Sequence, residues 1–452
     1  GFPNKMGANG GFPFLILYLA LALCCGVIIM LGELALGRKT GHGAVGAYQS
    51  ISKRFKWLGW LGIAAAALIF SFYSALGGYC LRYVVVNFGN LIGAEFGTNG
   101  VGGADVFQGL LSQPDVSIAF ALAFMLITML VVMSGVGGGI ERVCSVGMPA
   151  LFFILIICII RSCTLPGAVD GLKYMFVPGW AVANGIIDEA PGFWRVLTAA
   201  GGQMFFSLSL GAGVMITYGS YLDKKQDLGK STMIIVGMDT VVALMAGLCV
   251  IPGRFALDPN GALGGPELLF ITMQNVFDKM GPAGPVFGIL FYLLVFFAAI
   301  SSSISMLEVI VAHFCDKARE KGKGDRRKLY SAIAVVICAA LCALVCADGM
   351  GSNHISPAEL LGLAGAKLPG WSTSWLGLFD SVAEGLLMPL GALLMCLMIS
   401  WELKPDVLRQ EILLNGENRP WVYDFFRLCV KYITPLCMLM ILYGQISDFF
   451  IV

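Results

Sequence analysis

Ten predominantly apolar stretches, each long enough to cross a lipid bilayer as a helix, occur along this chain of 452 residues. A membrane-spanning helix needs roughly 20 consecutive apolar residues. A shorter apolar piece at 2–9 precedes the ten stretches, which lie at about 12–36, 58–88, 116–134, 147–163, 195–222, 233–252, 286–315, 329–347, 373–401 and 428–452. Only 13% of the residues are charged, about half the share that is usual in soluble domains. The sequence therefore predicts an all-α polytopic membrane protein with lipid as the solvent for much of its surface.

Basic residues are distributed unevenly between the loops that join these stretches. Lysine and arginine collect on the cytoplasmic loops of membrane proteins. Alternate loops are rich in both, above all the run from Lys317 to Lys328, whereas the loops between them carry only Lys173, Arg254, Lys279 and Lys367. The asymmetry predicts a multi-pass protein of the cell (plasma) membrane, with the first loop after residue 36 on the cytoplasmic side.

Composition argues against several classes of function. The net charge at pH 7 is +1, so no overall field attracts nucleic acid or an acidic partner. The chain has three histidines, far apart in sequence, and most of its 14 cysteines lie inside apolar stretches. The sequence shows neither zinc-ligand spacing nor a nucleophile paired with a base. We therefore expect no enzymatic activity, no organic cofactor and no nucleic-acid partner.

One apolar stretch contains residues that suit a plain lipid-facing helix poorly. The segment 201–213 combines glycines with aromatic residues and with the hydroxyls of Ser207 and Ser209. Backbone carbonyls freed by a break at Gly211 and Gly213 could not face lipid, but they could line a cavity that holds ions or solute. Two interpretations fit this segment equally well: a discontinuous helix at a binding site in the middle of the membrane, or a glycine and serine face for close helix packing.

Other polar residues also lie inside apolar stretches. Asp239 falls in the otherwise uncharged run Ile234 to Ile251. A carboxylate at membrane depth is costly and usually has a cation partner or a function, so we favour a functional role over a solvated position near the end of the span. The hydroxyls of 301–303 either bond back to the preceding helical turn or supply oxygen to a cation such as sodium. Tyr73 needs a hydrogen-bond partner, which is either a carbonyl of another helix or a polar solute.

Short motifs are spread over nearly the whole chain. They are Phe2-Pro3 with 7–11 (GANGG), 32–38 (GELALGR), 139–142 (GIER), 202–213, 217–221 (TYGSY), the serines at 301–303, and 432–435 (YITP). Each motif alone is weakly specific, but the set is highly specific. On these motifs the chain resembles the neurotransmitter:sodium symporter family, and most closely the bacterial amino-acid transporters in it.

The resemblance implies a fold of two inverted five-helix repeats in which helices 1 and 6 are broken. The chain would form a single transporter domain over 1–452 with about 11 helices, the first of them incomplete. The first repeat would cover 1–163 without the first half of helix 1, and the second would cover 190–401. An extra C-terminal helix would occupy 420–452.

The resemblance also implies roles for individual residues. Tyr73 would meet the substrate carboxylate, Phe206 would form an aromatic lid, and Ser209 would contact the amino group. The full set of substrate contacts would be Ile69, Tyr73, Phe206, Ser207, Ser209, Ala212, Ser302 and Met306. The first sodium site would use Ser207 and Asp239, and the second would use Ala298, Ser301 and Ser302. Asp380 would serve the extracellular gate and Asp316 the cytoplasmic gate.

Two residues depart from the family pattern in ways that bear on function. Asp239 aligns with an asparagine of the first sodium site. A fixed carboxylate can balance the charge of sodium, as a bound chloride does in chloride-dependent relatives, so we expect chloride-independent transport. Ala212 stands where a bacterial relative has phenylalanine. The smaller side chain leaves room for a ring, so we expect a large apolar or aromatic amino acid as the substrate.

The start of the chain also departs from the pattern. The arginine that partners the extracellular gate acid would stand immediately before Phe-Pro, where this chain has Gly1, and the cytoplasmic gate arginine would lie further upstream. The first half of helix 1 would supply backbone ligands to both sodium ions. We therefore expect an N-terminally truncated chain that does not drive sodium-dependent uptake by itself.

The function expected from these features is sodium-coupled symport of a small amino acid by alternating access. Sodium would be the coupling ion, an amino acid the substrate, and the lipid bilayer the surroundings, while the oligomeric state is left open. An ion channel is the first alternative, although it would need a repeated selectivity element along a pore. A solute sensor that binds without transporting is the second alternative.

Overall fold

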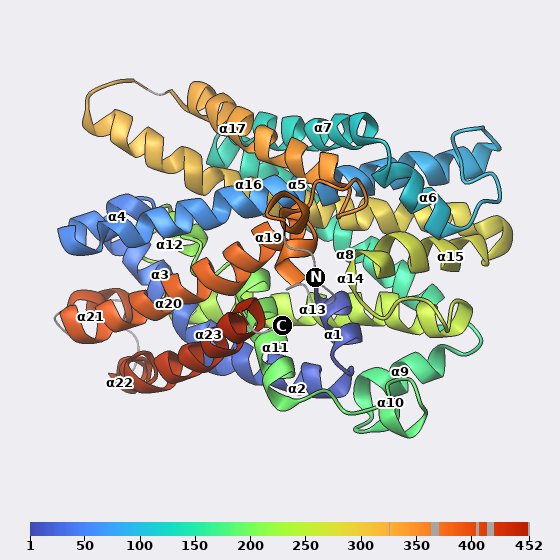
Figure 1. The fold of residues 1–452 in the computed structure, drawn as a ribbon. Coiled ribbons are helices and arrows are strands. Elements are labelled where there is room, and N and C mark those ends of the chain that lie inside the picture. The colour runs from blue at the N-terminus through green and yellow to red at the C-terminus, as the bar shows by residue number, and fades with distance from the viewer. Residues whose placement is uncertain (325, 363–369, 404–405, 414–419, 451–452) are drawn as a thin grey trace.

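The computed structural model describes residues 1–452 except 325, 363–369, 404–405, 414–419 and 451–452. Every regular element in this described part is a helix (Figure 1). Lys367, one of the few basic residues predicted for the sparsely charged loops, lies outside the described residues. The all-α character predicted from the apolar stretches is confirmed.

The first part of the chain forms one short helix followed by four predicted spans. The turn at Gly10 and Gly11, where φ is +81° and +69°, separates the first two helices. The elements are α1 (Phe2–Ala8), α2 (Phe12–Leu21), which continues through a π-helical turn into α3 (Val27–Thr40), α4 (Ala44–Ile51), α5 (Lys56–Ile92), α6 (Gly103–Leu111), α7 (Pro114–Met133) and α8 (Glu141–Cys163).

The middle of the chain carries the next four predicted spans. The short helices α9 and α10 precede α11, and the short helices α14 and α15 precede α16. The elements are α9 (Ala168–Phe176), α10 (Trp180–Ala183), α11 (Phe193–Leu208), α12 (Val214–Gly219), α13 (Leu228–Leu257), α14 (Gly265–Glu267), α15 (Met273–Asp278), α16 (Gly284–Glu320) and α17 (Arg327–Asp348).

The last part of the chain contains two further spans, both interrupted by π-helical turns. A π-helical segment, Ser381–Leu387, joins α19 to α20, and another, Cys429–Ile433, joins α22 to α23. The elements are α18 (Pro357–Leu360), α19 (Trp375–Asp380), α20 (Met388–Leu397), α21 (Asp406–Ile412), α22 (Pro420–Leu428) and α23 (Thr434–Phe450).

Nine helical segments among the described residues are long and apolar enough to cross a bilayer. They match nine of the ten predicted stretches. The remaining stretch, 195–222, is split into α11 and α12 by the non-helical residues 209–213. The helix is therefore discontinuous, as the first of the two interpretations requires, and a binding site at the break remains a prediction.

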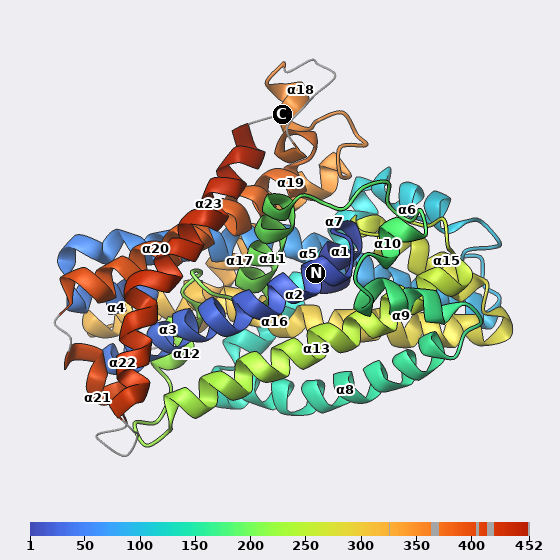
Figure 2. The same cartoon turned by 90° about the horizontal axis from the view of Figure 1, so that it is seen from below.

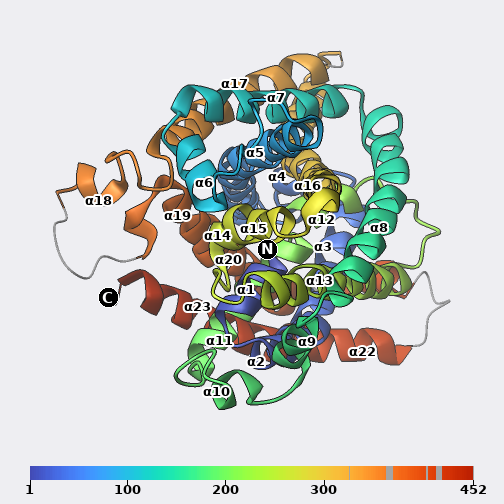
Figure 3. The same cartoon turned by 90° about the vertical axis from the view of Figure 1, so that its right-hand side faces the viewer.

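The helices divide into an inner set and an outer set. Viewed end-on, α5 and α16 lie toward the middle of the bundle, and α7, α8 and α17 lie toward its outside (Figure 3). Burial agrees with this view, because 67% of the apolar window of the α5 span is buried, compared with 17% for the span that contains α8. α8 packs along α13 on one side of the bundle (Figure 2). The exposed apolar surface of the outer helices is the surface that lipid would cover.

The loops gather at two opposite ends of the bundle. The elements of the basic loops, α4, α21 and α22, lie at the left of Figure 1, and α6 and α15 lie at the right. The predicted alternation of the spans is therefore consistent with the fold. Which end faces the cytoplasm remains a prediction from the distribution of lysine and arginine.

A close backbone contact fixes the position of α7 against α5. A Cβ atom built on Gly78 of α5 would lie 2.5 Å from the backbone nitrogen of Ala121 and 2.7 Å from its Cα atom. No real side chain tolerates such a distance to backbone, so α7 would have to move. Small residues allow helices in membranes to approach in this way.

We expect Gly78→Ala to destabilise the protein by about 1–3 kcal/mol, the usual cost of overpacking. The thermal unfolding midpoint of the purified protein in detergent would therefore fall. Gly237→Ala is the matched control, because Gly237 lies on a membrane helix with nothing within 4 Å of its built Cβ. Equal midpoints for the two variants would contradict the packing argument.

Candidate functional site

The break between α11 and α12 is built from residues that tolerate left-handed backbone. Ser209, Gly211 and Gly213 have φ values of +53°, +76° and +74°. At Gly211 a Cβ atom would also lie 2.1 Å from the carbonyl oxygen of Met388. Glycine is therefore required there both by conformation and by space.

A buried carboxylate from another helix satisfies the broken backbone. The Gly211 N–H donates to Oε1 of Glu33 at 2.7 Å. Glu33 lies on α3 and is 1% exposed. Because an unpaired backbone N–H away from water costs free energy, this bond stabilises the non-helical turn. Glu33 belongs to the family motif at 32–38, but the sequence alone does not indicate this role.

Ser207 and Asp239 lie together at the end of α11. The Ser207 hydroxyl is 2.9 Å from Oδ1 and 2.8 Å from Oδ2 of Asp239 on α13. The hydroxyl of Tyr18 on α2 donates to Oδ2 of the same carboxylate at 3.1 Å. The structure thus brings the two predicted ligands of the first sodium site into contact and adds Tyr18, which sequence reasoning missed. A tyrosine in the middle of an apolar stretch, without an assigned partner, was the available signal.

The serines of the second predicted sodium site lie on an unbroken helix. α16 is continuous from Gly284 to Glu320. The hydroxyl of Ser301 donates to the carbonyl oxygen of Ala298 at 2.9 Å, and the hydroxyl of Ser302 donates to the same oxygen at 3.3 Å. The back-bonding alternative considered for these serines is therefore present. These two hydrogen bonds also bring the hydroxyl oxygens of Ser301 and Ser302 close to the carbonyl oxygen of Ala298, the third predicted ligand.

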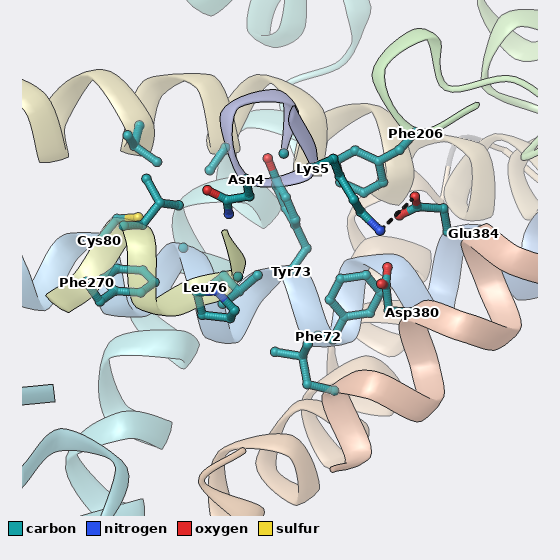
Figure 4. A pocket seen from close by; sticks show the side chains of 18 of the residues that line it. Asn4, Lys5, Phe72, Tyr73, Leu76, Cys80, Phe206, Phe270, Asp380 and Glu384 are labelled. Atoms are coloured by element: carbon teal, nitrogen blue, oxygen red, sulfur yellow. Dashed lines mark ion pairs between the residues drawn. The ribbon is translucent and has the colours of Figure 1, made fainter. Parts of the chain in front are cut away.

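A cavity of about 350 Å³ lies beside the predicted lid. Its lining includes Tyr73 and Phe206, whose ring centroids are 5.8 Å apart, and Asp380 (Figure 4). The remaining predicted substrate contacts do not line this cavity; they are Ile69, Ser207, Ser209, Ala212, Ser302 and Met306. Of these, Ile69, Ala212 and Met306 are almost fully buried. Their assignment to a substrate pocket remains a prediction.

The two predicted gate acids lie on different helices, α19 and α16. Asp380 ends α19 and lines the cavity, near the ion pair that Lys5 forms with Glu384. Asp316 lies near the end of α16, where its Oδ2 accepts a hydrogen bond from the Gly43 N–H at 2.9 Å. The assignment of both acids to gates remains a prediction. The structure gives each of them neighbours that the sequence did not indicate.

A second buried charge cluster lies toward the end of the bundle that carries the basic loops. Glu308 of α16 is 1% exposed and accepts hydrogen bonds from Arg327 at 2.6 and 3.0 Å and from the Tyr221 hydroxyl at 2.7 Å. Such a bidentate pair is among the stronger contacts of its kind. This pair is not among the predicted site residues, although an acid within the apolar stretch 286–315 indicates a cationic partner.

Comparisons with known proteins were consistent with this architecture. A family model described as "Sodium:neurotransmitter symporter family" matches residues 1–99 and 104–450. An uncharacterized sodium-dependent transporter of Bacillus subtilis (strain 168), YhdH, is 35% identical over 456 residues, which cover 99% of this chain and 92% of that protein. An uncharacterized sodium-dependent transporter of Methanocaldococcus jannaschii is 28% identical over 432 residues, which cover 91% of this chain and 79% of the relative.

A solved structure resembles the whole bundle. The crystal structure of MhsT in complex with L-phenylalanine has a TM-score of 0.83 and 32% sequence identity, and the match covers 98% of this chain and 94% of that chain. The similarity confirms the predicted family fold, with its two inverted repeats and broken helices, while the repeat boundaries remain predictions. Since the family model and a relative above 30% identity both extend over nearly the whole chain, this chain belongs to the sodium:neurotransmitter symporter family and is a sodium-dependent membrane transporter, not an enzyme.

Proposed function

We propose that the protein is a symporter that couples the inward movement of sodium to that of a large apolar or aromatic amino acid, without a requirement for chloride. The observation that carries this proposal is the contact of Ser207 with Asp239 at the break between α11 and α12. It combines a carboxylate, a hydroxyl and irregular backbone at membrane depth. The complex of MhsT with L-phenylalanine supports an amino acid as the class of substrate.

The side chains at the break suit a hard cation. Sodium takes oxygen ligands, and the carboxylate of Asp239 together with the hydroxyl of Ser207 supplies them. The oxygens of Ala298, Ser301 and Ser302 form a second group, drawn together by the hydrogen bonds within α16. These are the residues that we expect to hold the transported sodium ions.

Ser207 is the expected link between the ion and the substrate. It contacts Asp239 directly and follows Phe206, which lines the cavity. Coupling is a free energy shared by two sites, and it is reciprocal: sodium raises substrate affinity by the same factor by which substrate raises sodium affinity. A residue that contributes to both sites can carry part of that free energy.

Asp239 provides the argument for chloride independence. Its carboxylate is held by two hydroxyls, Ser207 and Tyr18, and no basic partner for it is recorded among the described residues. A buried carboxylate without a cation is costly. The cost falls when a cation binds beside it, so the fixed negative charge favours sodium binding without a second ion.

We expect Ser207→Ala to weaken both sodium and substrate binding by roughly tenfold to a hundredfold, the effect of losing one hydrogen bond to a charged group. Sodium-coupled uptake by the transporter, with sodium and substrate titrated in turn, measures both changes. Ser331→Ala is the matched control, because Ser331 is a buried serine of α17. Unchanged sodium dependence in Ser207→Ala would remove the proposed link. Flux that does not saturate would favour a channel, and binding without counterflow would favour a sensor.

Uptake should be equal in sodium chloride and in sodium gluconate. We expect Asp239→Asn to lower sodium affinity by roughly tenfold or more, because the variant loses the balancing charge, and we expect chloride to restore part of it. Asp115→Asn, a change at an exposed acid in the first turn of α7, serves as the control. Strong chloride stimulation of the unaltered transporter would contradict this part of the proposal.

Competition for labelled tryptophan, tyrosine or leucine by a panel of amino acids tests the predicted pocket. We expect large apolar and aromatic amino acids to compete best. Ala212→Val and Ala212→Phe should weaken competition by tryptophan more than competition by alanine, because each fills space that a ring would use. Thermal unfolding midpoints of both variants identify any loss of folding. If glycine or alanine competes best in the unaltered transporter, the pocket argument is wrong.

A further inference from the structure

Two basic residues lie four positions apart near the junction of α22 and α23, and α22 lies on the outside of the bundle (Figures 1 and 3). Arg427 is in the last turn of α22, and Lys431 is at the centre of the π-helical segment that follows, Cys429–Ile433. Among the described residues, neither side chain forms an ion pair with an acid. Like charges four residues apart on a helix repel each other, so an anion between them would be stabilising.

Both basic residues line one cleft with a volume of about 280 Å³. A water molecule occupies about 30 Å³ in the liquid, so the cleft has ample room for a phosphate group. Two cations and one acid leave the cleft with a net charge of +1, which a single phosphodiester would neutralise. The lining residues are Asp424, Arg427, Leu428, Lys431 and Tyr432.

Aromatic rings hold one of the two cations in place. The Nζ atom of Lys431 lies 5.0 Å from the centroid of the Trp401 ring and 5.1 Å from the centroid of the Tyr432 ring. Such contacts attract an ammonium group to the face of a ring but do not neutralise its charge. Trp401 belongs to the π-helical segment that follows α20, Met398–Glu402. The ammonium group is therefore fixed beside the cleft by two parts of the fold, and its charge stays available to a ligand.

The surroundings of the cleft have the character of a membrane interface. The side chains of Trp401 and Trp421 are 68% and 62% exposed, and tryptophan is enriched where the hydrocarbon core meets the lipid headgroups. Further along the chain, Leu436 and Leu439 continue an exposed apolar face on α23. A phosphate in the cleft would therefore lie at the level of the headgroups, with an apolar surface next to it that suits acyl chains.

We propose that this cleft binds the headgroup of an anionic phospholipid, with Arg427 and Lys431 holding the phosphate and the acyl chains lying along the exposed face of α23. The inference does not depend on the proposed function. Basic pockets between membrane helices bind the headgroups of acidic lipids. Phosphatidylglycerol neutralises the cleft, whereas phosphatidylcholine brings its own ammonium group and leaves the excess positive charge. Asp424 can accept a hydrogen bond from a headgroup hydroxyl, which phosphatidylglycerol has and phosphatidylcholine lacks.

Titration of the purified transporter in detergent with phosphatidylglycerol, with bound lipids counted by native mass spectrometry, tests the cleft. We expect Arg427→Gln and Lys431→Gln each to weaken the tightest binding event by roughly fivefold, and Lys431→Arg to retain it. Binding of phosphatidylcholine should be the same in all variants. Arg54→Gln is the matched control, because Arg54 is an exposed arginine in a basic loop, lies 6.0 Å from the centroid of the Phe55 ring, and does not line the cleft.

Asp424→Asn should have the opposite effect. The change raises the charge of the cleft, so we expect phosphatidylglycerol to bind roughly threefold more tightly. This variant decides the matter even if Arg427→Gln or Lys431→Gln lowers the thermal unfolding midpoint in phosphatidylcholine nanodiscs. Unchanged affinity for phosphatidylglycerol in the double variant Arg427→Gln with Lys431→Gln would overturn the proposal. Displacement of the lipid by millimolar inorganic phosphate would identify a site for a soluble anion instead, and loss of a dimer in the double variant would identify an interface between copies; either result would also overturn it.

Discussion

The hydrogen bond from the Gly211 N–H to Glu33 is the contact on which the rest of the site depends. Lipid offers no partner to a free backbone N–H or carbonyl, so a helix can be interrupted within a membrane only where protein satisfies the exposed groups. Glu33 does this from α3, and the absence of a side chain at Gly211 lets the turn approach Met388. These two features accommodate the non-helical turn at 209–213, and Ser207 lies directly before it, near the end of α11.

The interruption places a hydroxyl beside a carboxylate that comes from elsewhere in the fold. Asp239 belongs to α13, yet Ser207 of α11 and Tyr18 of α2 both donate to it. Two neutral donors reduce the cost of the buried charge without cancelling it. The remaining charge is what a cation would balance. The same arrangement therefore explains how the carboxylate is tolerated in the fold and why it would favour sodium.

A structural feature of this protein could be predicted from the sequence where it depends on neighbouring residues in the chain, and not where it depends on how distant helices pack. Nine spans were predicted correctly because apolar length is a local property, and the break at 209–213 was among the alternatives because glycines and serines mark it. The contact of Ser207 with Asp239 was indicated only through the family resemblance. The pairs Lys5 with Glu384 and Glu308 with Arg327 were missed. Their formation depends on how each helix is rotated and, for Glu384, on a π-helical turn, and neither property is encoded in a residue pattern that can be read locally.

The two missed ion pairs differ in a way that bears on transport. Arg327 binds Glu308 through two short contacts of 2.6 and 3.0 Å, and their side chains are 16% and 1% exposed. Lys5 meets Glu384 through one contact of 3.5 Å, with a lysine that is 39% exposed. Breaking either pair would leave a buried carboxylate, but Glu308 is 1% exposed and Arg327 16%, whereas Glu384 is 8% exposed and its lysine already reaches water, so breaking the first pair costs more. In the conformation described, the contact of Arg327 with Glu308 is therefore held more firmly than the contact of Lys5 with Glu384. A transporter that works by alternating access must keep one closure in place while the other opens, because it would leak its ion gradient if both were open at once.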